Sequence, residues 1–99
     1  MNQAYKPIQH EADHLFHRTE SMIDDHHAAH EIVKISMDVR EMIENDRKPR
    51  AVEDRIRQLL RLLEPLKVAP GQAMTPQEAS TLVGDYEHLC GQLRKLPNY

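Results

Sequence analysis

The sequence is poor in the residues that build disulfide-linked, aromatic or β-rich architectures. Its 99 residues include one cysteine, three glycines, one phenylalanine, three tyrosines and no tryptophan. A single cysteine excludes an internal disulfide, and the scarcity of β-branched or alternating runs argues against strands. No apolar run approaches the ~20 residues of a membrane-spanning helix, and the first residues lack the apolar core of a signal peptide. We therefore expect a soluble, cytoplasmic protein with one domain, residues 1–99, and an aliphatic core.

Three segments carry apolar residues at helical spacing and predict an all-α class, a small helical bundle. A long N-terminal helix is expected over residues 8–46, which contain no glycine or proline, after a loose start at residues 1–7. A short antiparallel helix is expected over 50–64, and a third helix over 75–96. The third begins with Thr75-Pro76-Gln77-Glu78, the pattern of a capping box. The predicted buried stripes of the last two helices are Val52, Ile56, Leu59, Leu60 and Leu63, and Ala79, Leu82, Val83, Tyr86, Leu89, Cys90, Leu93 and Leu96.

The apolar stripe of the long segment changes direction along its length. Its N-terminal half has Ile8, Ala12, Leu15, Phe16, Thr19, Met22 and Ile23 on one face, while Ala29, Ile32, Ser36, Val39 and Ile43 lie on a face rotated by roughly a third of a turn. Two interpretations explain the rotation. Either the helix breaks near residues 21–25, where Ser21 or Asp25 could cap a second helix, or one helix presents its two halves to different partners. We expect one continuous helix.

A continuous first helix leaves its N-terminal half without a partner inside the chain. Its apolar residues would then meet a second copy or another protein. The interface residues expected on this basis are Leu15, Phe16, Met22, Ile23, His26 and His30. The corresponding function is a non-enzymatic interaction module, a small adaptor, chaperone-like or regulatory protein that acts as a homodimer or on a protein partner through a helical surface.

The net charge of −3 conceals a strong asymmetry. Residues 8–46 carry ten acidic and three basic side chains, a charge of −7, whereas residues 47–67 carry seven basic and three acidic ones, a charge of +4. The simplest interpretation is a basic second helix that folds back on the acidic first one. A nucleic-acid-binding regulator is a weaker alternative, because Arg50, Arg57 and Arg61 share one face but are interleaved with acidic residues in a chain of pI near 6.1.

Seven histidines raise the alternative of a histidine-rich metal-binding protein. His10-Glu11-Ala12-Asp13-His14 matches the H-E-x-x-H pattern, but His17 lies about 10 Å along the helix from His10, too far to complete a three-histidine site. His26 and His30 from two chains could supply four imidazoles. The weak metal candidates are therefore His26, His30, His10 and His14, and we expect neither a cofactor nor an enzyme.

Carboxylate-x-x-His pairs occur at Glu11/His14, Asp24/His27 and Asp85/His88, the spacing used in di-iron helical bundles. The first two pairs would lie about 20 Å apart on one continuous helix, so a shared site is not expected. Gly84 and Gly91, seven residues apart in the third helix, have two interpretations. They either permit close approach by another helix or are tolerated on the surface.

Overall fold

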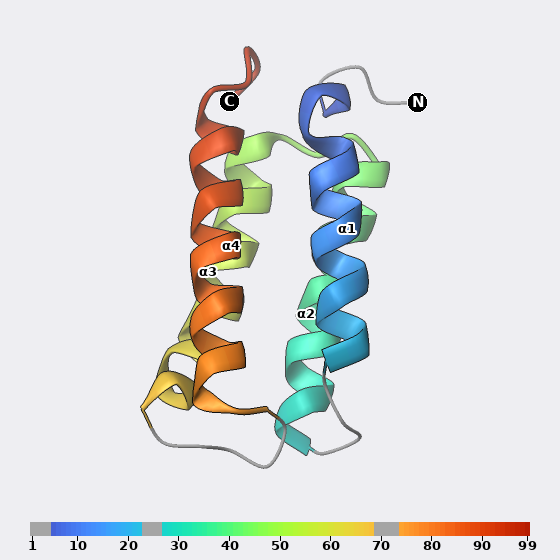
Figure 1. Ribbon diagram of the computed structural model, residues 1–99. Coiled ribbons are helices and arrows are strands. Elements are labelled where there is room, and N and C mark those ends of the chain that lie inside the picture. Colours follow the sequence, from blue (N-terminus) through green and yellow to red (C-terminus); the bar gives the residue numbers. More distant parts are fainter. Residues whose placement is uncertain (1–4, 23–26, 69–73) are drawn as a thin grey trace.

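The chain folds into a bundle of antiparallel helices (Figure 1). A computed structural model describes residues 5–22, 27–68 and 74–99, and of residues 22 and 27–29 it describes the backbone alone. The described residues form α1 (Lys6–Met22), α2 (His27–Glu44), α3 (Pro49–Leu63), the short 3-10 helix η1 (Glu64–Lys67) and α4 (Pro76–Arg94). The predicted all-α class is confirmed. None of these helices is long and apolar enough to cross a membrane.

Each of the four α-helices runs opposite to the one before it (Figure 1). Helix α1 contacts α2 and α4, and α3 contacts the same two helices from the other side of the bundle. The contacts of α3 are the more extensive, so α1 is the helix with the least packing to its neighbours. Ion pairs join neighbouring helices. Arg55 of α3 pairs with Asp38 of α2 at 2.6 Å, a contact between the basic and the acidic segment as the charge asymmetry predicts. Arg40 of α2 pairs with Glu20 of α1 at 3.3 Å, within the acidic segment.

The prediction of one continuous helix over residues 8–46 is wrong. Helices α1 and α2 are separate elements that pack against each other, which two halves of one straight helix cannot do. Folding back lets both rotated stripes face the same core, so the rotation reflects two helices and not two partners. The proposed break near residues 21–25 falls largely on residues 23–26, which lie outside the described part of the chain.

The core consists of the predicted stripes. Every predicted stripe residue of α3 and α4 is buried, together with Leu96 just beyond α4. The stripe residues of the first segment whose side chains are described are buried as well: Ile8, Ala12, Leu15, Phe16, Thr19, Ile32, Ser36, Val39 and Ile43. Ile35 of α2 is also buried. Cys90 is among these packed side chains, and burial raises the pKa of its thiol to about 11. This thiol is packed in the core and poorly suited to act as a nucleophile.

The turn between α2 and α3 is fixed by backbone hydrogen bonds and by an N-terminal tyrosine. Asp46 has a φ of 58°, and the N–H groups of Asp46 and Arg47 donate to the carbonyls of Ile43 and Met42, the pattern of a Schellman motif. The hydroxyl of Tyr5 donates to the Arg47 carbonyl, and Tyr5 is fully buried. The expectation that residues 1–7 are loose is therefore wrong at residues 5–7, because Tyr5 is buried and α1 begins at Lys6. Residues 1–4 lie outside the described part of the chain.

Helix α4 begins as its sequence predicts. The Glu78 N–H donates to Thr75 Oγ1 at 3.1 Å, and Thr75 N–H donates to Glu78 Oε1 at 2.8 Å. The capping box is confirmed. A Cβ atom built on Gly84 or Gly91 meets no described atom within 4 Å, and both residues are exposed. They are surface glycines of this chain, and no described helix approaches them closely.

Two buried polar clusters connect the helices. Tyr86 of α4 places its hydroxyl 2.7 Å from Thr19 Oγ1 of α1 and 3.4 Å from Ser36 Oγ of α2. The second cluster surrounds Glu53 of α3, which is 3% exposed and accepts hydrogen bonds from Arg94 Nε at 3.0 Å and from Tyr99 Oη at 2.6 Å. Both clusters join elements distant in sequence, which favours one arrangement of the helices over alternatives.

Candidate functional site

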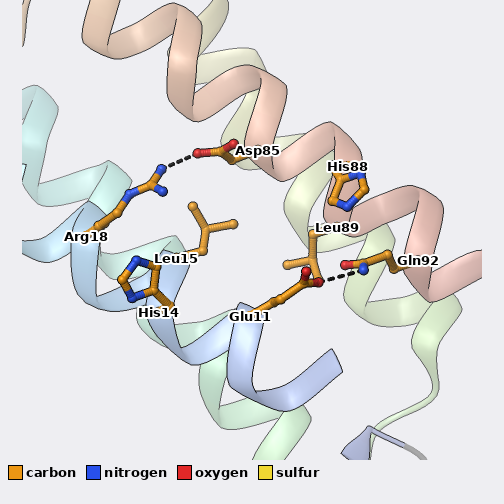
Figure 2. A pocket seen from close by; sticks show the side chains of 8 residues that line it. All are labelled: Glu11, His14, Leu15, Arg18, Asp85, His88, Leu89 and Gln92. Carbon is orange, nitrogen blue, oxygen red and sulfur yellow. Dashed lines mark hydrogen bonds and ion pairs between the residues drawn. The ribbon is translucent and has the colours of Figure 1, made fainter. Parts of the chain in front are cut away.

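A groove of about 170 Å³ lies between α1 and α4, on the seam where α1 meets the C-terminal helix (Figure 2). Each helix contributes four residues at the same offsets of 0, 3, 4 and 7, the spacing of one helical face. The lining residues are Glu11, His14, Leu15 and Arg18 from α1 and Asp85, His88, Leu89 and Gln92 from α4. Because the helices are antiparallel, the two sets face each other in reverse order.

Polar contacts across the seam close both ends of the groove. Gln92 Nε2 donates to Glu11 Oε2 at 2.6 Å, and Arg18 pairs with Asp85 (Figure 2). The side chains of Arg18 and Asp85 are 37% and 40% exposed, so solvent screens this pair and its contribution is only about 0.2–1 kcal/mol. These contacts hold α1 on α4 without rigidly fixing the seam.

The middle of the groove is apolar at its base and ionisable at its rim. Leu15 and Leu89 are buried beneath it, and His14 and His88 are exposed on either side of the two leucines (Figure 2). Among the described residues neither imidazole has a hydrogen-bond or ion-pair partner. An apolar centre surrounded by polar groups is the usual arrangement of a protein-binding surface.

The volume of the groove limits what it can bind. Pockets for cofactors and drug-sized ligands measure about 300–1,000 Å³, well above the 170 Å³ found here. An apolar cavity of about 150 Å³ accommodates one benzene ring. The groove therefore has room for one apolar side chain of a partner and not for a typical organic cofactor.

Two of the residues expected at an interface with another chain, Leu15 and Phe16, are buried inside this chain. Phe16 is 1% exposed and Leu15 6% exposed inside the single chain, because α1 packs on α2 and α4 instead of projecting as an arm. Within the single chain both side chains belong to the core. An interface with a second chain at these two positions stays a prediction. His30 is exposed, while the side chains of Met22, Ile23 and His26 lie outside the description.

The metal candidates belong to no cluster of three or more possible ligands in the described part of the chain. There, no group of three or more histidine, cysteine, aspartate or glutamate side chains is placed to hold a metal ion. The fold does bring two carboxylate-x-x-His pairs, Glu11/His14 and Asp85/His88, to one groove. Their carboxylates face Gln92 and Arg18, however, and are not free to converge on an ion. The third pair includes Asp24, which lies outside the described residues.

The sequence singles out six of the eight lining residues but not their common location. Leu15 and Leu89 lie on the apolar stripes, and the other four form the two carboxylate-x-x-His pairs. No sequence motif singles out Arg18 or Gln92. The available signal was the shared offset pattern on two segments, which gains meaning only when the segments are known to be antiparallel neighbours. Comparisons with protein-family models, curated proteins and solved structures find no match for this chain.

Proposed function

We propose that this chain is a non-enzymatic helical interaction module that works in the cytoplasm and binds a segment of another protein at the groove between α1 and α4. One observation carries the proposal: the groove combines a base of two leucines, a rim of two exposed imidazoles and a volume suited to one side chain. Its single cysteine is buried and unpaired, which is consistent with a reducing compartment.

A polypeptide is the ligand class that best matches this geometry. Helical surfaces recognise partner segments through apolar anchors that enter small pockets, while polar groups around each pocket align the segment. The two leucines would contact the anchor, and the two exposed imidazoles on the rim would meet its polar flanks. Adaptor, chaperone-like and regulatory proteins all use such a surface.

Charge favours a basic partner segment over a second copy of this chain. Helix α1 carries two basic and three acidic side chains and α4 carries one basic and three acidic ones, so the helices that form the groove have charges of −1 and −2. Two copies docked through this face would place acidic helices together, which is unfavourable. A segment with an apolar anchor flanked by lysine or arginine complements the face.

Site-specific photo-crosslinking tests the location of binding. A photo-reactive side chain at position 88 should yield a discrete adduct with a second polypeptide in cells. The same group at Arg50, which is exposed on α3, the helix diagonal to α1, serves as the matched control. Circular dichroism should show both variants folded. Adducts of equal yield from positions 88 and 50, or none from 88, would exclude the groove as the binding surface.

A further inference from the structure

A second hollow lies on the other flank of α1 and is lined by all three histidines of that helix. It measures about 610 Å³ and is lined by His10, Asp13, His14 and His17 of α1 and by Arg40 and Glu44 of α2. All three imidazoles are exposed, and none has a hydrogen-bond or ion-pair partner among the described residues. Their nitrogens are thus accessible to a ligand.

His10 and His14 have the spacing of a helical chelate. Four residues of helix correspond to about 6 Å along the axis, one turn, and histidines at this spacing on one helix face can bind the same ion. His17 lies one further turn from His14 and cannot join His10 on one ion. Glu11 does not serve such a site because its carboxylate accepts from Gln92 in the other groove.

Charge in the hollow favours a cation. Asp13 and Glu44 contribute two carboxylates to its lining, and the one basic lining residue, Arg40, is paired with Glu20 at 3.3 Å. Arg40 also lies over the ring of Phe16, with its guanidinium carbon 6.0 Å from the ring centroid. These contacts hold the Arg40 guanidinium against α1. The negative charges of Asp13 and Glu44 then favour binding of a divalent cation in the hollow.

We propose that His10 and His14 bind one divalent transition-metal ion of the zinc class, with water completing its coordination. Imidazole is a preferred ligand of zinc, nickel and copper, whereas magnesium prefers oxygen ligands. The site is separate from the docking groove, although His14 lies on the ridge between the two hollows and lines both. It does not depend on the proposed docking function.

Metal binding would stabilise the fold because the two imidazoles are held one turn apart only when α1 is helical. Zinc at ten times its dissociation constant would then raise the ratio of folded to unfolded protein about elevenfold. For a domain of this size this corresponds to an increase in Tm of about 6–11 °C. Magnesium at the same concentration should leave Tm unchanged.

Titration calorimetry and thermal melting with zinc chloride test the assignment, using protein purified without a histidine tag. Removal of either chelating imidazole, by His10→Gln or His14→Gln, should abolish the zinc-dependent increase in Tm. His17→Gln and His88→Gln are matched controls on exposed histidines and should retain it. Because all these positions are exposed, we expect the variants to fold as the native chain does.

One further variant tests whether histidines outside the hollow contribute to zinc binding. A chain with His26→Gln, His27→Gln and His30→Gln together should still bind one zinc ion with the full increase in Tm. Loss of binding in that variant, or retention in His14→Gln, would overturn the proposal. Loss in His17→Gln without loss in His10→Gln would do the same, as would an equal response to magnesium.

Discussion

Neutralising Glu53 should remove a large part of the stability of the bundle. Hydrogen bonds from Arg94, followed by those from Tyr99 and Arg57, lower the pKa of this carboxyl from 4.5 to about 2, against the opposing effect of burial. A decrease of that size corresponds to roughly 3 kcal/mol of unfolding free energy at neutral pH. The side chains of Arg94 and Arg57 are 57% and 40% exposed, so solvent screens part of their interaction with Glu53 and reduces this free energy. We expect Glu53→Gln to cost about 2 kcal/mol at pH 7.

The pH dependence of this loss has a definite sign. The folded-state pKa of Glu53 lies below the unfolded-state value, so the unfolded chain binds more protons between pH 4.5 and about 2. The stability that the carboxylate contributes is therefore fully present above pH 4.5 and falls as pH drops through this window. Below it, native Glu53 is protonated and resembles glutamine in charge. The free energies of unfolding of the native chain and Glu53→Gln should converge near pH 2.

Urea unfolding followed by circular dichroism at pH 7, 4 and 2.5 measures this directly. Asp54→Asn is the matched control, because Asp54 is the neighbouring carboxylate and is exposed. It should change the free energy of unfolding by less than about 0.5 kcal/mol. A difference between the native chain and Glu53→Gln that is the same at every pH would refute the reasoning, as would a cost at pH 7 no larger than that of the control.

Three further predictions concern single helices. Gly84→Ala and Gly91→Ala should each raise stability by about 0.5–1 kcal/mol, since both positions are exposed helix interior with open space for a methyl group; a lower Tm would reveal a contact at that face. Thr75→Ala should cost about 1 kcal/mol in urea unfolding by removing the cap of α4, and an unchanged midpoint would show that the cap contributes nothing. Leu15→Glu should abolish folding, at a cost of about 5 kcal/mol, because Leu15 is 6% exposed in the chain. A folded Leu15→Glu monomer in sedimentation would instead support the interface between two chains.

The parts of the fold that the sequence predicts are those with local causes. The stripes of α3 and α4 follow from the helical period, and the start of α4 follows from the capping chemistry of Thr75 and Glu78. The division between α1 and α2 has a weaker local signal, because residues 8–46 contain no glycine or proline. The indications are the rotation of the apolar stripe and the possible capping residues Ser21 and Asp25. Deciding between one helix and two requires knowing what α1 packs against.

The unpredicted features depend on contacts between residues far apart in the chain. Glu53 lies one helical turn before Arg57, yet it also accepts hydrogen bonds from Arg94 and Tyr99, which lie 41 and 46 residues away. Tyr5 is buried and donates its hydroxyl to a carbonyl 42 residues further on. The groove between α1 and α4 has the same origin, since neither helix forms it alone. The sequence indicates the apolar stripes and the two His motifs, but it does not indicate that they meet in one groove.

Identification of the molecule joined to a photo-reactive side chain at position 88 tests the central claim most directly. Mass spectrometry of the adduct should find an apolar residue of a different protein, close in sequence to lysine or arginine, with no corresponding adduct from position 50. Attachment to nucleic acid, to a small metabolite or to a second copy of this chain would contradict the account of the groove as a docking site for a basic partner segment.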